Sequence, residues 1–225
     1  MIVVTGASKG LGKAICERLS SKNMEVFGVS RDVSSVKFPA MSCDVSSYDD
    51  IKKLVKELKR LKVNIDGLIN AAGIAAMNLA VTTPPDMSRR IIDTNLLGTI
   101  YCCQLIAPLM IRNKRGSIVN FSTIAVALGL KGESVYAASK AGIEGFTRPF
   151  AREMSDFNIK VNCIAPGPIN TDLLKGITST QIDNIVSQQI IQKQYSPDSI
   201  CDLVELLLDN RTNSLTGATL HVGGV

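Results

Sequence analysis

The chain has 225 residues, of which 45% are hydrophobic and 20% are charged, and it contains no Trp. This length and composition suit one large globular domain and exclude an intrinsically disordered or low-complexity protein. The formal net charge of +5 is spread over short basic clusters between acidic residues, so we expect no nucleic-acid-binding arm.

Apolar runs that predict strands alternate with helical patterns along the whole chain. The seven runs are residues 1–5, 24–30, 39–43, 66–70, 117–121, 159–164 and 218–222. Because single helical segments separate most of them, we expect right-handed crossovers into one parallel sheet. The sequence therefore predicts an α/β protein in which residues 1–225 form a single doubly wound domain with a seven-stranded parallel sheet flanked by helices.

A glycine cluster, TGASKGLG, follows the first predicted strand and opens the first predicted helix. Glycines at such a junction let main-chain N–H groups and a helix N-terminus approach a phosphate closely. The GxxxGxG spacing at the first strand favours a dinucleotide site over a simple turn. The cofactor-binding residues predicted here are Gly6, Ser8, Lys9, Gly10, Leu11 and Gly12.

The end of the second predicted strand, VSRD, indicates which dinucleotide is bound. In the dinucleotide fold, an acidic side chain here suits a ribose 2′-hydroxyl, whereas a basic one suits a 2′-phosphate. This chain has Ser30 where the acid is expected, followed by Arg31, and Lys9 adds a second cation. We therefore expect NADPH rather than NADH, although the nearby Asp32 leaves NADH as the alternative.

The stretch NFSTIAVALGLKGESVYAASK ends with Tyr136 and Lys140, four residues apart in a helical pattern. This spacing stacks two side chains on one helix face. A nearby ammonium group favours the phenolate, so the pKa of Tyr136 is expected to fall from its ordinary value of about 10. Tyr136 is then a candidate general acid for a carbonyl that accepts hydride, or a general base for an alcohol.

Two features depart from the regular alternation. Pro149, in GFTRPFARE, lies inside the helical pattern of Tyr136 and predicts a kink or an early break there. The polar segment 168–195 leaves the end of the sixth predicted strand and is predicted to form a substrate lid.

The start of the chain, MIVVTG, lacks the basic and long apolar regions of a secretory signal. No uninterrupted stretch of about 18 apolar residues predicts a membrane span. The six cysteines form no CxxC pair, and the single histidine, His221, is expected to be packed or on the surface. We expect a cytoplasmic protein with reduced, buried thiols, no metal site and no membrane contact.

Taken together, the motifs resemble those of the short-chain dehydrogenase/reductase family over essentially the whole chain. They are TGASKGLG, CDVS at 43–46, NAAG at 70–73, Asn95 in IIDTNLLG, NFST, YAASK and PGPINT. The resemblance implies a Rossmann fold, an NAD(P) cofactor and an Asn–Ser–Tyr–Lys catalytic set. In that set Tyr136 matches the acid/base, Lys140 matches the residue that bonds the nicotinamide ribose, and Asn95 matches the support of a proton-relay water.

The family's serine stands thirteen residues before the tyrosine, and here Thr123 occupies that position, with Ser122 beside it. Threonine supplies the same hydroxyl, so the predicted catalytic residues are Asn95, Thr123, Tyr136 and Lys140, with Ser122 as the alternative. On a strand end the two hydroxyls are expected to point to opposite sides.

The resemblance also implies further cofactor contacts. Asp44 and Val45 are expected beside the adenine, and Asn70, Ala71 and Gly73 along its ribose. Pro166, Gly167 and Ile169 are expected by the nicotinamide, and Thr171 by the carboxamide or pyrophosphate. Asp66 is expected to be structural.

Among the relatives, the compact chain most resembles bacterial 3-oxoacyl-[acyl-carrier-protein] reductases. Those enzymes use basic residues near the fifth strand and on the tyrosine helix to meet their acidic carrier. Lys114 and Arg115 match the first site, whereas SDFN, just past Met154, supplies no cation at the second. The expected substrate is a small ketone or acyl thioester, with acyl carrier protein as a candidate partner.

Alternatives remain for the function and the assembly. One is a reductase of another small ketone, a sugar or a polyketide intermediate, and another is a non-catalytic NADP(H)-sensing protein. The family's C-terminal tail often packs against another subunit. Here it has Gly223 in place of the usual Asp and stops at Val225, so a homodimer is favoured over a homotetramer.

Overall fold

Seven parallel strands form one sheet in the computed structural model, which describes residues 1–174 and 177–225. The strand order is β3-β2-β1-β4-β5-β6-β7. The strands are β1 (Ile2–Thr5), β2 (Val26–Ser30), β3 (Ala40–Ser42), β4 (Gly67–Asn70), β5 (Gly116–Phe121), β6 (Ile159–Pro166) and β7 (Thr219–Val222). This confirms the predicted doubly wound α/β fold. The order reverses between β1 and β4, where such sheets bind ligands beyond the carboxyl ends of their strands.

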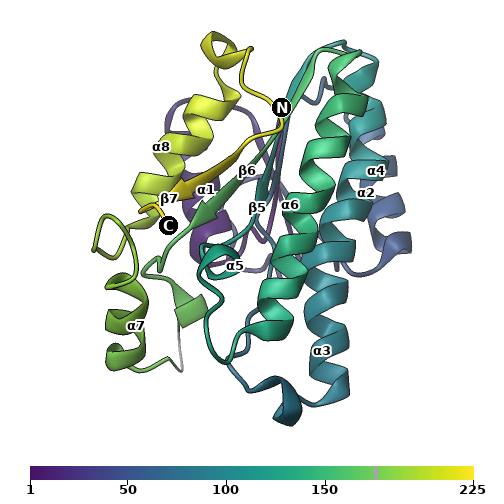
Figure 1. The fold of residues 1–225 in the computed structure, drawn as a ribbon. Helices are drawn as coiled ribbons and strands as arrows, with labels where there is room; N and C mark the ends of the chain where they lie inside the picture. The colour runs from purple at the N-terminus through teal and green to yellow at the C-terminus, as the bar shows by residue number, and fades with distance from the viewer. Residues whose placement is uncertain (175–176) are drawn as a thin grey trace.

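Helices cover both faces of the sheet (Figure 1). One face carries α1 (Gly10–Ser21) and α8 (Pro197–Leu208), and the other carries α2 (Tyr48–Arg60), α4 (Gly98–Ile111) and α6 (Ser134–Ser155). The shorter helices are α3 (Pro85–Ile91), α5 (Ala125–Leu128) and α7 (Ser179–Val186). A π-helix, Ile92–Leu97, joins α3 to α4, and 3₁₀ turns occur at Ala80–Thr82, Asp172–Leu174 and Asn210–Thr212.

The strands are apolar on both sides because each side contributes to a separate core. Val3 packs with the α2, α4 and α6 face, whereas its neighbour Val4 packs with the α1 and α8 face. The same alternation separates Ile118 from Val119 on β5. Successive side chains of a strand point to opposite faces, so a sheet with helices on both sides requires continuous apolar runs.

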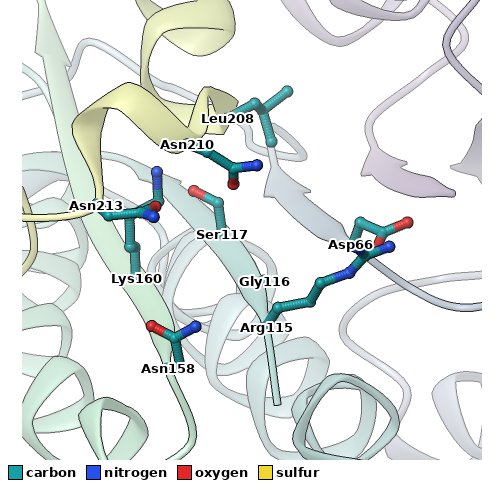
Figure 2. A pocket seen from close by; sticks show the side chains of 9 residues that line it. All are labelled: Asp66, Arg115, Gly116, Ser117, Asn158, Lys160, Leu208, Asn210 and Asn213. Atoms are coloured by element: carbon teal, nitrogen blue, oxygen red, sulfur yellow. The ribbon is translucent and has the colours of Figure 1, made fainter. Parts of the chain in front are cut away.

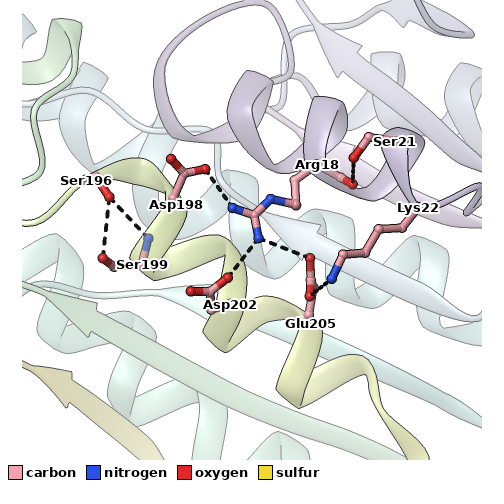
Figure 3. Close-up of polar contacts among 8 residues, drawn as sticks. All are labelled: Arg18, Ser21, Lys22, Ser196, Asp198, Ser199, Asp202 and Glu205. Carbon is pink, nitrogen blue, oxygen red and sulfur yellow. Dashed lines mark hydrogen bonds and ion pairs between the residues drawn. The ribbon is translucent and has the colours of Figure 1, made fainter.

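Ion pairs tie α1 to α8 across the outer surface (Figure 3). Arg18 donates to Asp198 at 2.7 Å and to Asp202 at 2.8 Å, and Lys22 pairs with Glu205. The side chains of Asp198 and Asp202 are mostly exposed, so each pair contributes little and is weakened by salt. The buried faces of the two helices therefore supply most of the contact energy.

Helix α6 continues through Pro149 to Ser155, so the predicted early break is wrong. Proline removes the N–H that would bond the carbonyl of Gly145, four residues earlier. Both Pro149 and Gly145 lie on the exposed side of the helix, where water can bond that carbonyl. The helix tolerates the proline because the opposite side, with Phe150, Ala151 and Met154, is buried in the core.

The helical run Pro85–Ile111 is long and apolar enough, by length and composition, to cross a membrane, with a mean hydropathy of 1.4. The interior helix of a globular protein meets the same criteria. In the run Pro85–Ile111, 44% of the most apolar window is buried. Cys102, Ile106 and Met110 on this run are buried in the core. All six cysteines are free and buried, as expected, and His221 is exposed.

Candidate active site

A cavity of about 370 Å³ opens near the carboxyl ends of the central strands. It brings together residues that are far apart in the sequence, from the glycine turn to segment 168–195. The predicted site residues that line it are Lys9, Gly10, Leu11, Arg31, Ala71, Gly73, Thr123, Tyr136, Lys140, Pro166, Gly167, Ile169 and Thr171. Most of the predicted cofactor residues thus share one cavity with three of the four predicted catalytic residues, and the fourth, Asn95, is not part of its lining.

The glycine turn has the backbone that a phosphate cradle needs. Gly6 has φ +71° and Gly10 has φ +56°, a left-handed conformation that side chains other than glycine rarely adopt. A Cβ on Gly12 would overlap the carbonyl of Gly6, so the third glycine allows α1 to lie close against the turn. Because α1 begins at Gly10, which lines the cavity, its N-terminal N–H groups are suited to bind an anion there.

Several predicted cofactor residues lie outside the cavity lining: Gly6, Ser8, Gly12, Asp44, Val45 and Asn70. The Ser8 hydroxyl bonds that of Ser30 at 2.7 Å. The carboxylate of Asp44 accepts bonds from the N–H of Ser46 at 2.9 Å and from its hydroxyl at 2.7 Å, and so fixes the turn before α2. Val45 is buried against Gly98.

The side chain of Asn70 faces the protein interior, and its expected ribose contact stays a prediction. Its amide donates to Asn120 Oδ1 at 2.9 Å, and Asn120 in turn donates to the Thr147 hydroxyl at 3.0 Å. Asn70 and Asn120 are direct partners in the β4–β5 register, so their side chains meet on the same face of the sheet. The pairing of the two strands therefore directs Asn70 away from the cavity.

The two neighbouring hydroxyls, Ser122 and Thr123, have different partners. Thr123 lines the cavity together with Tyr136, and its hydroxyl acts to lower the pKa of the Tyr136 phenol. The Ser122 hydroxyl donates to the carboxylate of Glu144 on α6. Of the two hydroxyls, that of Thr123 is the one that acts on the predicted acid/base residue.

The pKa of Tyr136 is raised above its ordinary value, opposite to the predicted direction. Burial is the main cause, the negative charge of Glu133 adds to it, and the hydrogen bond from Thr123 acts against it. Lys140 is not positioned to reverse this effect, because its Nζ donates to the carbonyl of Phe121 at 2.8 Å and lies 5.9 Å from the centre of the Tyr136 ring.

Lys140 is itself an unusual cation, since its side chain is buried. Burial lowers its pKa to about 8, and the nearby Cys163 thiol only partly opposes this effect. A lysine with this pKa is partly neutral near physiological pH. It can therefore exchange a proton under conditions in which an exposed lysine stays charged.

Asn95 lies in the π-helix and is completely buried. Its side-chain oxygen accepts from the N–H of Ile74 at 2.8 Å, and its amide donates to the Ile74 carbonyl at 2.9 Å and to the Ser139 hydroxyl at 3.1 Å. Asn95 thus fixes the backbone that follows Gly73 to helix α6. Single π turns inside α-helices often mark functional sites. The support of a proton-relay water by Asn95 stays a prediction.

Sequence reasoning missed Glu133, which lies three residues before Tyr136 and lines the cavity. The available signal was its position on the helix that carries Tyr136. An acidic residue at a helix start is common for electrostatic reasons, so the sequence did not distinguish this residue from an ordinary cap.

A second, polar cleft of about 240 Å³ lies at the amino ends of β5 and β6 (Figure 2). Arg115 points toward Asp66 there, and Nε of Arg115 donates to the carboxylate at 2.9 Å. Asp66 also accepts from the N-terminal amine at 2.7 Å, so it holds the chain start against this edge. The residues matched to a carrier-docking site are therefore at the opposite end of β5 from the cavity.

The fold and the cavity define a nucleotide-binding oxidoreductase, and comparison with known proteins identifies its family. The sequence pattern of the short chain dehydrogenase family matches residues 1–182. The chain belongs to this family, as its motifs predicted. It is an oxidoreductase of the class that acts on CH–OH groups, and the family's structures bind NAD(P)(H).

Individual relatives differ in substrate and cofactor. The chain is 33% identical to the 3-oxoacyl-[acyl-carrier-protein] reductase FabG of Staphylococcus epidermidis, over 99% of this chain and 96% of the relative. Its structure resembles that of ElxO with NADP bound, with a TM-score of 0.90, 27% identity and coverage of 98% and 96%. It equally resembles 4-hydroxyisoleucine dehydrogenase complexed with NADH, with a TM-score of 0.91, 26% identity and coverage of 99% and 97%.

Proposed function

We propose that the protein is an NADPH-dependent reductase that converts a ketone to a secondary alcohol, with 3-oxoacyl thioesters as the leading substrate class. The observation that carries the proposal is that Thr123, Tyr136 and Lys140 line one cavity together with the glycine turn. The 33% identity to a 3-oxoacyl-[acyl-carrier-protein] reductase supports the substrate class.

The proposed roles follow from the chemistry of each group. When bound, the dinucleotide supplies a hydride for the carbonyl carbon. Thr123 and Tyr136 hold the ketone oxygen with their hydroxyls, and Tyr136 gives this oxygen a proton as charge develops on it. A raised phenol pKa keeps Tyr136 protonated and ready to act as the acid. Lys140, with a pKa of about 8, is suited to return a proton to Tyr136, and Asn95 supports the water that completes this exchange.

Cation placement supports NADPH over NADH. Lys9 and Arg31 both line the cavity, and they come from the two turns that flank the expected adenosine position. Asp32, the residue that favours NADH, accepts a hydrogen bond from the N–H of Ser34 at 2.9 Å, which holds its carboxylate in its own turn. That bond lowers the pKa of Asp32 and leaves Arg31 as the side chain available to a 2′-phosphate.

Segment 168–195 is proposed to cover the substrate. Its two ends are joined, because Tyr195 donates its N–H to Pro168 O at 3.1 Å and accepts from the N–H of Asn170 at 3.2 Å. Between these ends, α7 and the adjoining residues direct Leu174, Ile177 and Ile185 to the cavity. Residues 175 and 176 of this proposed lid lie outside the described residues. An apolar cover of this kind would exclude water from the reaction.

A carrier-linked substrate would also require a second subunit. Lys114 and Arg115 precede β5, whose six residues span about 17 Å toward the cavity end. A carrier docked at these residues would lie at the far end of its own subunit, so it would serve the cavity of a neighbour. We therefore propose a homodimer or homotetramer, with acyl carrier protein as a candidate partner.

The test is consumption of NADPH by the purified protein with an acetoacetyl thioester, in wild type and in Tyr136→Phe. We expect turnover that is lost in the variant while NADPH affinity changes little. Turnover that survives in Tyr136→Phe would contradict the mechanism. Tight NADPH binding without turnover would contradict the thioester assignment and favour another ketone substrate or the NADP(H)-sensing alternative.

A further inference from the structure

Glu133 carries a carboxylate into the cavity beside the predicted catalytic residues. It is the N-cap residue of α6, it is partly buried, and it lines the same cavity as Thr123, Tyr136 and Lys140. Burial alone raises the pKa of this carboxyl above its ordinary value. Among the described residues, no hydrogen bond or ion pair engages the carboxylate, unlike that of Glu144 on the same helix, which accepts from Ser122. Within residues 1–174 and 177–225, the Glu133 carboxylate is therefore a cavity-lining acceptor without a partner.

Among the residues that the structure describes, no cation neutralises the Glu133 carboxylate. Leu130, Ile74 and Ile177 contribute apolar side chains to the same cavity. The cations Lys9 and Arg31 follow β1 and β2, and β2 stands three strand positions, about 14 Å, from β5. Lys140 donates to the carbonyl of Phe121. The negative charge does reach the reaction centre, because it contributes to the raised pKa of Tyr136.

We infer that Glu133 is a substrate-recognition group, which accepts a hydrogen bond from an N–H or O–H of the substrate and excludes ketones that carry a carboxylate beside the reacting carbonyl. A carboxylate in a partly buried, apolar cavity repels a second anion strongly, since water screens the pair poorly. A substrate N–H or O–H group that donates to this carboxylate would in turn bind favourably, because a buried acceptor gains from a hydrogen bond. A 3-oxo acid would then be reduced as a neutral ester or thioester and not as the free acid.

This inference rests on the proposed ketone reductase activity, and the test separates the two. The substrates are methyl acetoacetate and acetoacetate, which share the reacting ketone and differ in one negative charge. The proteins are wild type, Glu133→Gln and Glu153→Gln. The last is a matched control, because Glu153 is an exposed acid on the same helix and its replacement changes the net charge equally.

For each protein, kcat/KM is measured with NADPH for both substrates, and the ratio of ester to acid is compared. We expect wild type and Glu153→Gln to prefer the ester equally, and Glu133→Gln to reduce that preference by about ten- to a hundredfold. The change should come mainly from faster reduction of acetoacetate. An unchanged ratio in Glu133→Gln would overturn the inference and leave the reductase assignment intact.

A binding measurement covers the case in which no protein turns over either ketone, which would count against the proposed function. The NADPH-loaded proteins are titrated calorimetrically with 3-hydroxybutyrate and with its methyl ester. Weaker binding of the acid in wild type, relieved in Glu133→Gln but not in Glu153→Gln, would still support the inference. Equal discrimination in all three proteins, or no binding to any of them, would overturn it.

Discussion

The hydroxyl of Ser122 donates a hydrogen bond to the carboxylate of Glu144, one helical turn beyond Lys140 on α6. Its neighbour Thr123 instead lines the cavity with Tyr136 and acts to lower the pKa of that phenol. Two adjacent hydroxyls at the end of one strand therefore differ in role. That of Ser122 links the end of β5 to α6, and that of Thr123 lies at the predicted reaction centre.

Replacing each hydroxyl tests this division. Thr123→Ala should lower kcat by about 10²- to 10³-fold, because it removes a donor to the developing oxyanion. Ser122→Ala should change kcat only a few-fold, but lower the free energy of unfolding by about 1–3 kcal/mol, because it breaks a bond to a charged group. Steady-state kinetics and urea unfolding of both variants measure these effects. A greater kinetic loss in Ser122→Ala would show that the serine holds the carbonyl.

The buried Lys140 should make stability depend on pH. Its folded-state pKa of about 8 lies below the 10.5 of an exposed lysine. Between these values the unfolded chain holds a proton that the folded chain has lost, so this group's contribution to stability rises with pH, by about 3 kcal/mol in total. Urea unfolding should show the stability of wild type rising relative to that of Lys140→Met between pH 7.5 and about 10, because the buried cysteines affect both proteins alike and cancel in the difference. Parallel profiles for the two proteins would refute it.

Cofactor choice should depend on Arg31. In Arg31→Asp, repulsion replaces attraction at the 2′-phosphate, so the ratio of NADPH to NADH affinity should fall by at least about tenfold. The control is Arg152→Asp, which makes the same charge change on an exposed part of α6. Fluorescence titration with both dinucleotides measures the ratio. If the two variants behave alike, long-range charge rather than contact at Arg31 explains any change.

Gln189 is wedged between two glycines of separate segments. It is buried, and a Cβ on either Gly167 or Gly223 would overlap its Oε1. Gly167→Ala should lower the free energy of unfolding by about 1–3 kcal/mol, and adding Gln189→Ala should recover part of this loss. Gly223→Ala should cost more and recover less, because its φ of +95° strains any side chain.

A matched control for these glycine variants is Gly145→Ala, where no atom lies within 4 Å of the added Cβ. It should be neutral or stabilise the protein by up to about 1 kcal/mol, since alanine favours a helix interior. Urea unfolding of the single and double variants provides the comparison. Equal losses with and without Gln189→Ala would show that Gln189 does not cause the clash.

Much of the fold was predictable because its signals are local. The run predicted as 117–121 became β5, Gly116–Phe121, since a parallel strand between two helical layers must be apolar on both sides. The glycine turn was equally readable, because the need for left-handed backbone at Gly6 and Gly10 is a property of those residues themselves. The four-residue spacing of Tyr136 and Lys140 placed both on one helix and in one cavity.

The features that could not be predicted concern side chains whose behaviour depends on distant partners. Pro149 does not end α6, because the exposed side of that helix leaves the freed carbonyl accessible to water. Asn70 faces the interior because β4 pairs with β5 in the register that sets Asn120 beside it. A short stretch of sequence does not determine which side of a helix is exposed or which register two strands adopt.

By itself, the sequence determined the alternation of strands and helices, the phosphate-binding turn and the identity of the candidate catalytic groups, because residue type and spacing control backbone conformation over a few residues. Only the tertiary structure decided which hydroxyl meets Tyr136, that Glu133 enters the cavity, and that the pKa of Tyr136 rises while that of Lys140 falls. Those outcomes depend on burial and on charges brought together from separate elements. Desolvation and Coulomb interactions act through space and are set only when the chain is folded.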